Sequence, residues 1–82
     1  MMEYIEFFKA KTVFDRSFDV CYSVFKEDNS YGIESFVCGG RFYEKVCVGN
    51  HEENEVKNLA LLFAEKGVHP LHIEDIISDM RF

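Results

Sequence analysis

The chain has 82 residues, 48% of them hydrophobic and 16% aromatic, which is enough for one hydrophobic core and leaves no room for a second. Nine basic residues against 15 acidic ones give a formal net charge of −6, which repels phosphate and argues against direct binding of nucleic acids or anionic membranes. No apolar run approaches the roughly 18 residues of a membrane span, so we expect a single cytoplasmic domain over residues 1–82.

Residues 1–14 are rich in residues that favour β-strands, but their spacing is neither regularly alternating nor helical. The apolar members are Tyr4, Ile5, Phe7 and Phe8. We predict an edge strand here, because Lys9 and Lys11 supply charges of the kind that discourage edge-to-edge pairing. A short amphipathic helix is the alternative.

From residue 19 to residue 48 the apolar residues alternate, and two turn signals interrupt them, Asp28-Asn29 and Gly39-Gly40. Read as two-residue loops, these turns place Tyr31 opposite Val48 and Glu34 opposite Lys45. The predicted strands are 18–27, 31–38 and 41–48. Although the turns are read independently, both put the same residues on one face: Val20, Tyr22, Val24, Ile33, Val37, Val46 and Val48.

After Gly49 the apolar period changes to that of a helix. Asn50 is predicted to cap a first helix, with Glu53 completing a capping box, and Gly67 is predicted to end it in the left-handed conformation. Pro70 fits the first position of a second helix. The apolar stripes comprise Val56, Leu59, Ala60, Leu62 and Phe63 in the first helix and Leu71, Ile73, Ile76, Ile77 and Met80 in the second.

Both helical stripes need an apolar surface to pack against, and the Val/Ile face of the sheet provides it. We therefore predict an α+β fold, in which an antiparallel β-meander of three to four strands carries a C-terminal helical hairpin on one face. The opposite face of the sheet then points away from the helices.

That opposite face carries three aromatic residues, Phe25, Phe36 and Tyr43, with Glu34 and Lys45 beside them. An aromatic cluster rimmed by paired charges is typical of a protein-interaction surface, so we predict these five residues to bind a partner. The alternative is that the aromatic pairs only stabilise the sheet, each by about 0.2–1 kcal/mol, or that the N-terminal segment covers them.

No set of residues predicts catalysis, a cofactor or a metal site, and we do not expect an enzyme. The cysteines Cys21, Cys38 and Cys47 all fall on the aromatic side of the sheet without a CxxC motif, and we interpret them as reduced packing residues. His69 and His72 are a weak metal pattern, and histidine near proline at a helix start is more often a cap or a packing residue.

Two motifs resemble a known family. Tyr31-Gly32-Ile33-Glu34 is similar to a YGIE-type strand, and residues 67–79 are similar to a closing V-x-P-x-H-L-x-D-I-x-x-D pattern, with His72, Ile73 and Asp75 at its H-L-x-D positions. Both motifs belong to a family of short uncharacterised bacterial proteins, a domain of unknown function commonest in spore-forming anaerobes. The resemblance implies this fold and a bacterial origin, and it implies no activity.

The first functional hypothesis is a small acidic, non-enzymatic interaction or regulatory module that binds a partner protein, either as a monomer or as a homodimer. The second is a phage-borne or antitoxin-like inhibitor that blocks the basic groove of a nucleic-acid-handling protein with its carboxylates. Its contacts would be Glu52, Glu53, Glu55, Glu74, Asp75 and Asp79. A metal or small-ligand binder using His69 and His72 ranks third.

Overall fold

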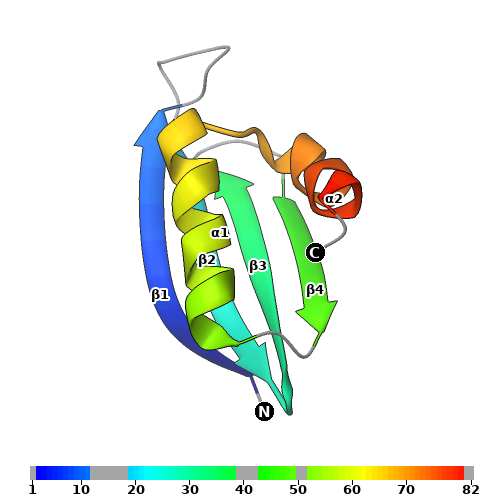
Figure 1. Ribbon diagram of the computed structural model, residues 1–82. Helices are drawn as coiled ribbons and strands as arrows, with labels where there is room; N and C mark the ends of the chain where they lie inside the picture. Colours follow the sequence, from blue (N-terminus) through cyan, green and yellow to red (C-terminus); the bar gives the residue numbers. More distant parts are fainter. Residues whose placement is uncertain (1, 12–18, 39–42, 50–51, 81–82) are drawn as a thin grey trace.

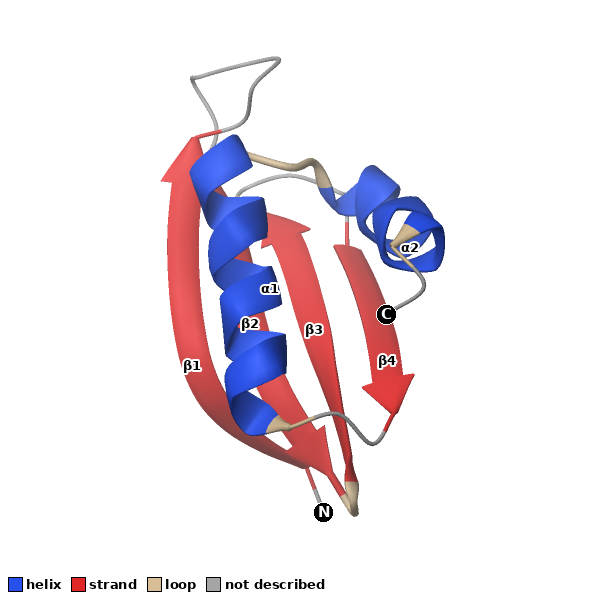
Figure 2. Cartoon of the chain, viewed as in Figure 1, coloured by secondary structure: helices blue, strands red, loops and turns tan. Residues whose placement is uncertain are grey.

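The structure, a computed structural model, describes residues 2–11, 19–38, 43–49 and 52–80 and consists of a four-stranded antiparallel sheet with two helices (Figures 1 and 2). The elements are β1 (Met2–Lys11), β2 (Asp19–Glu27), β3 (Ser30–Val37), β4 (Tyr43–Gly49), α1 (Glu53–Lys66) and α2 (Pro70–Asp79). The strands pair in chain order. Figure 1 shows both helices on one side of the sheet, α1 running along the strands and α2 beside β4. The predicted α+β meander with helices on one face is confirmed, as is the N-terminal edge strand.

The β2–β3 hairpin has the predicted register. Val24 lies opposite Ile33, and Val20 lies opposite Val37, as a two-residue loop at Asp28-Asn29 requires. The backbone of Asp28 has a φ of 57°, in the left-handed region that tight hairpin turns use. Turn chemistry and alternation therefore agree on this part of the sheet.

The β3–β4 ladder has the predicted register over most of its length, including Glu34 opposite Lys45. It departs from the prediction at Tyr31, which lies opposite Gly49 and not opposite Val48. A register shift next to Tyr31 makes Val48 an extra residue on β4, as in a β-bulge. Gly49 has a φ of 82°, a conformation that glycine adopts at little cost, so the chain can absorb the shift there.

The edge strand β1 also contains a register shift, between Tyr4 and Glu6. One extra residue, Ile5, therefore lies on β1 without a counterpart on β2. As a result Tyr4 and Phe7, three positions apart, lie on the same face of the sheet, since their partners on β2 are only two positions apart. The extra residue Ile5 explains why the apolar residues of this segment do not alternate regularly.

The first helix begins at Glu53, with Glu52 as an N-cap that makes no side-chain cap hydrogen bond. The predicted cap Asn50, with the capping box that it would complete, and the predicted turn Gly39-Gly40 lie outside the described residues. The end of the helix is as predicted: Gly67 has φ 60° and ψ 42°, and its N–H donates back to carbonyls of the last turn.

The second helix begins at Pro70, as predicted, and His69 caps it by accepting a hydrogen bond at Nδ1 from the Leu71 N–H at 3.2 Å. Leu71 and Met80 were predicted to belong to the apolar stripe, but they are 55% and 49% exposed. Leu71 lies about 200° around the helix from Ile73, and Met80 follows the last helical residue. The stripe that reaches the core is therefore narrower than predicted.

The core lies between the helices and the sheet face beneath them, which we call the covered face. Tyr22 is fully buried in it, packs against Phe63 with ring centroids 6.4 Å apart, and donates a 2.5 Å hydrogen bond to the Val68 carbonyl. The buried members are Val20, Tyr22, Val24, Ile33, Val37, Val48, Val56, Leu59, Ala60, Phe63, Ile73 and Ile77. Neither helix in the described part of the chain has the length and apolar character to cross a bilayer.

Candidate functional site

The opposite side of the sheet, which we call the open face, lies away from both described helices (Figure 1). The cross-strand pairing assigns to it Tyr4, Phe7, Lys9, Cys21, Ser23, Phe25, Gly32, Glu34, Phe36, Tyr43, Lys45 and Cys47. All five residues predicted to bind a partner are among them. Ser23, Phe25 and Glu34 are at most 9% exposed, so this face has a packed centre of its own.

Phe25 is fully buried although no described helix lies above it. Its ring covers Gly32 on the neighbouring strand, where an added Cβ atom would also lie 2.6 Å from the backbone oxygen of Val46. The Lys45 ammonium lies 5.1 Å from the ring centroid, in a cation–π contact, and 3.5 Å from the carboxylate of Glu27. Phe25 therefore supports the open face from within, and its predicted role as a direct partner contact does not fit its burial.

Glu34 lies between two tyrosines, and its two carboxylate oxygens each accept a hydrogen bond. Tyr4 donates to Oε1 at 2.9 Å, and Tyr43 donates to Oε2 at 2.5 Å. The bond to this carboxylate raises the pKa of both phenols, that of Tyr43 to about 12, because ionising either would place a second negative charge beside Glu34. The three side chains come from β1, β3 and β4, so the cluster ties the two edge strands to the centre of the sheet.

Aromatic side chains around Glu34 remain accessible. Tyr4 is 44% exposed, Phe7 is 62% exposed and Tyr43 is 56% exposed. The rings of Tyr4 and Phe7 stack with centroids 5.8 Å apart, and Phe36 lies half-buried opposite Tyr43. The open face is thus an exposed aromatic surface with a carboxylate at its centre.

Sequence reasoning missed Tyr4 and Phe7 as members of this surface. Strict alternation puts positions 4 and 7 on opposite faces of a strand, and only the extra residue Ile5 brings them together. The signal that was present is the broken alternation itself: an apolar strand whose period of two fails at one point indicates a bulge.

The six acidic residues predicted to enter a basic groove lie on the helical side, in two groups. Glu52, Glu53 and Glu55 are at the start of α1, where Glu53 pairs with Lys57 at 3.0 Å. The others are Glu74, Asp75 and Asp79, all exposed on α2. Residues 70–79 contain no lysine or arginine, so no side chain of α2 with a permanent positive charge offsets these three carboxylates.

The two histidines of the predicted metal pattern lie at the start of α2, with ring centroids 6.2 Å apart. Burial lowers the pKa of His69, and the neighbouring His72 lowers it further. His69 acts as a helix cap, which is the role that the sequence favoured over a metal ligand. Within the described residues no group of three His, Cys, Asp or Glu side chains is placed to hold a metal ion, and His51 lies outside them.

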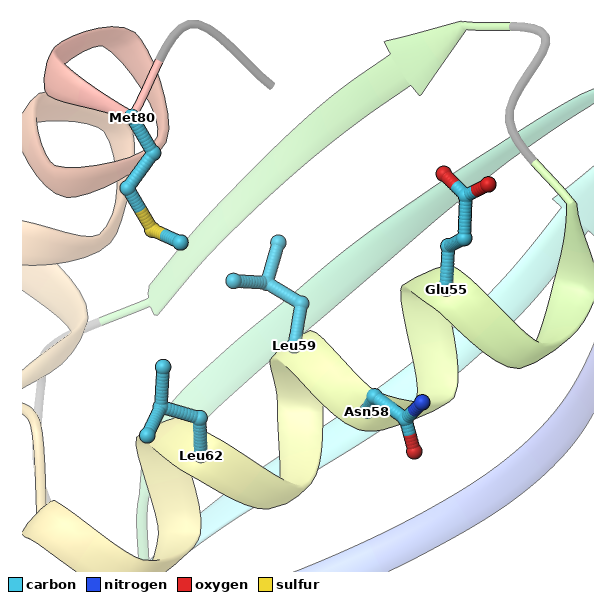
Figure 3. A pocket seen from close by; sticks show the side chains of 5 residues that line it. All are labelled: Glu55, Asn58, Leu59, Leu62 and Met80. Carbon is cyan, nitrogen blue, oxygen red and sulfur yellow. The ribbon is translucent and has the colours of Figure 1, made fainter.

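A shallow groove of about 310 Å³ lies between α1 and the end of α2 (Figure 3). Met80 extends towards Leu59 and Leu62 of α1, while Glu55 and Asn58 line the same side further along the helix. The lining contains one carboxylate and one amide, and no second titratable group among its residues. The groove therefore offers no acid–base or nucleophile–base pair of the kind that catalysis needs.

Comparison with family models, with curated proteins and with solved structures finds no match to this chain. Its function is therefore inferred from the geometry of its own surfaces.

Proposed function

We propose that the protein is a small acidic interaction module that binds a partner protein through the open face. The observation that carries the proposal is the exposure of Tyr4, Phe7 and Tyr43 around a nearly buried carboxylate on a face that no described helix covers. Aromatic side chains present a large, stiff contact area, and tyrosine in particular combines an apolar ring with a polar end. Such residues are enriched among those that dominate binding energy at protein interfaces.

A partner that inserts a basic side chain fits this surface best. Glu34 supplies the negative charge at the centre, and the chain as a whole has a formal net charge of −6. An arginine or lysine of the partner could lie over the aromatic rings and pair with this carboxylate. A second copy of the chain docked about a two-fold axis that passes through the centre of this face, at Glu34, would bring two Glu34 carboxylates together, which like-charge repulsion disfavours. The proposed partner is therefore a different protein with a basic contact.

The test introduces a photo-cross-linking amino acid at position 7 or, as a matched control, at position 61. Phe7 and Leu61 are both exposed apolar residues, 62% and 41% exposed, but Leu61 lies on α1. We expect position 7 to capture one host protein in stoichiometric amount, at a basic surface, and position 61 to capture none. Capture from position 61 alone, or from neither position, would contradict the proposal.

The captured protein then allows the affinity to be measured with purified components. Tyr43→Ala should weaken binding by about tenfold or more, as expected for an interface aromatic, while Leu61→Ala leaves the affinity unchanged. Light scattering on the chain alone should give the 9.6 kDa of the monomer. A particle of twice that mass that becomes monomeric in the Tyr43→Ala variant would show that the open face binds a second copy of the chain and not a different protein.

The acidic inhibitor remains a second candidate because α2 presents three carboxylates and no lysine or arginine. Binding through several exposed carboxylates should fall steeply as salt is added. Binding through the open face should fall less, because its one proposed ion pair involves the nearly buried Glu34, which salt screens less. The double variant Glu74→Gln, Asp75→Asn separates the two candidates. It should abolish binding by an acidic inhibitor and leave binding through the open face intact.

A further inference from the structure

Two cysteine side chains meet on the open face. Cys21 lies in β2 opposite Phe36 of β3, and Cys38 follows β3, where its N–H donates to the Asp19 carbonyl at 2.8 Å. Cys38 is therefore the diagonal neighbour of Cys21 on the same face. Diagonal neighbours are commonly about 7–8 Å apart at the backbone, but here the two Sγ atoms lie 3.2 Å from each other because the side chains lean together. Both residues are half-buried, so a small oxidant can reach them.

We propose that Cys21 and Cys38 form a modification site, a thiol pair that closes to a disulfide when the protein meets a peroxide or a small-molecule disulfide. Forming the bond requires the sulfur atoms to approach by roughly 1.2 Å, to the S–S length of about 2.05 Å. Rotation of the side chains supplies part of this approach, and a small shift of the backbone at Cys38, which follows the end of β3, supplies the rest. The inference rests on these two residues alone and is independent of the proposed partner binding.

The chemistry balances with either oxidant. With hydrogen peroxide, one thiol is oxidised to a sulfenic acid with release of water, and the second thiol displaces the hydroxyl group as another water. With oxidised glutathione, one thiolate attacks the glutathione disulfide and releases glutathione, and the second thiolate displaces the other glutathione. In each case two electrons leave the cysteine pair and reduce the oxidant.

Burial, more than the charged neighbours, sets the pH at which the pair reacts. Burial raises the pKa of Cys21, and the hydrogen bond with Cys38 raises it further. Lys9 acts in the opposite direction, while Asp19, which pairs with Lys9 at 3.3 Å and Lys11 at 2.7 Å, adds to the rise. Since the thiolate is the attacking form, disulfide exchange should become faster as the pH is raised.

The third cysteine provides an internal control. Cys47 is exposed on β4 and lies opposite Gly32. Gly32 is four residues before Phe36 in β3, which places Cys47 about 13 Å along the sheet from the level of the Cys21 pairing. The fold therefore predicts which two of the three thiols combine.

Peptide mapping tests the inference on the full chain. The reduced protein is freed of reductant, treated with oxidised glutathione or hydrogen peroxide, blocked at its remaining thiols and digested with trypsin. Cleavage after lysine and arginine places the three cysteines on separate peptides, 17–26, 27–41 and 46–57. We expect a linked species of 17–26 with 27–41, lighter than the sum of the two peptides by two hydrogen atoms, and a Cys47 that carries either the blocking group or a glutathione adduct. Separate glutathione adducts on Cys21 and Cys38 without this species would overturn the inference.

The same reaction in urea shows whether the fold directs the pairing. In the unfolded chain loop closure favours Cys38 with Cys47, nine positions apart, over Cys21 with Cys38, 17 positions apart, by about two- to threefold. In the native protein we expect the Cys21–Cys38 bridge to exceed the Cys38–Cys47 bridge by about tenfold or more, a reversal caused by proximity. If the ratio of the Cys21–Cys38 bridge to the Cys38–Cys47 bridge were the same in the native and unfolded chains, the inference of a preformed pair would be wrong.

Serine variants complete the test. Cys47→Ser should form the bridge as the native chain does, whereas Cys21→Ser and Cys38→Ser should each take up a glutathione adduct on the remaining thiol of the pair. If a serine variant does not fold, which circular dichroism reveals, the comparison of native and unfolded wild-type chains still decides the question.

Discussion

On the covered face, Val24 and Ile33 are fully buried in a core that also contains side chains of α1 and α2, whereas on the open face Phe25 is just as buried by contacts within the sheet. The first arrangement brings together residues distant in the sequence. The second uses neighbouring strands only. Gly32 leaves space for the Phe25 ring, and the ammonium of Lys45 lies over that ring. Burial of a large side chain therefore does not require a second layer where a facing glycine lets the ring lie against the sheet.

The difference has a functional side. Tyr22 and Phe63 are buried in the core beneath the helices, whereas Phe7 and Tyr43 on the open face are exposed. The proposed partner would therefore meet aromatic side chains that are already accessible in the folded protein. The following predictions test whether side chains buried on the two faces contribute equally to the stability of the fold.

The largest expected effect comes from removing one phenyl ring on each side. Phe25→Ala and Phe63→Ala should each lower the free energy of unfolding by about 3–5 kcal/mol, because both rings are almost fully buried. Urea denaturation followed by circular dichroism measures both values. A loss below about 1 kcal/mol for Phe25→Ala would mean that the open face is not a core, and the equivalence of the two faces would fail.

A smaller loss of stability should follow when the space above Gly32 is filled by a side chain. The Cβ atom of Gly32→Ala would meet the Phe25 ring and lie 2.6 Å from the Val46 oxygen, so we expect a cost of about 1–3 kcal/mol. In the Phe25→Ala background the ring is gone and part of that cost should vanish. Strictly additive losses in the double variant would show that the ring and the glycine do not depend on each other.

Acid should weaken the covered side through the cap of α2. Burial lowers the pKa of His69 below its ordinary value of 6.5, so the unfolded chain binds this proton more readily than the folded one. The stability that neutral His69 contributes is therefore complete above pH 6.5 and is lost as the pH falls below it, together with the bond that Nδ1 accepts from Leu71. Loss of an N-cap costs about 0.5–2 kcal/mol.

Urea midpoints at about pH 7.5 and pH 5 measure this loss, since histidine changes charge between them. His69→Asn is the matched control, because asparagine caps a helix without titrating. The variant should show a smaller loss of stability on acidification than the native chain. An identical loss in both would assign the pH dependence to other groups.

The smallest effect should come from the two serines buried one on each face. Ser23 on the open face and Ser35 on the covered face have hydroxyls without a hydrogen-bond partner among the described residues. Replacing either by alanine removes an unpaired polar group, so stability should stay within about 1 kcal/mol of the native value or rise. A loss above about 2 kcal/mol for one serine alone would show that its hydroxyl is paired in solution and that the two faces differ at this point.

Much of the sheet was predictable because independent signals agreed. The Asp28-Asn29 turn fixes which residues of β2 and β3 face each other, and alternation of apolar residues fixes which way they point. Gly67 and Pro70 likewise marked a helix end and a helix start by restrictions of their own backbones. Local chemistry sets these features, and so one sequence suffices to find them.

The parts that were missed depend on contacts between elements. The register shifts at Ile5 and Val48 each add one residue to a strand, a change that no local propensity specifies. The shift at Ile5 is the one that brings Tyr4 and Phe7 together on the open face. The burial of Phe25 depends on the empty space above Gly32, which appears only when two strands are aligned. Alternation predicts on which face of the sheet a side chain lies, but it does not predict how deeply that side chain is buried.

The meander has a further consequence for how the chain acquires its fold during synthesis. Every strand pairs with the strand next to it in the sequence, so the loops to be closed are short and the sheet can assemble rapidly. The helices that cover the Val/Ile side come after the four described strands in the chain, so a ribosome produces them after the sheet. Until the helices are made, the nascent sheet exposes the apolar side chains of the covered face. The open face does not depend on the helices, because its buried side chains pack against neighbouring strands alone.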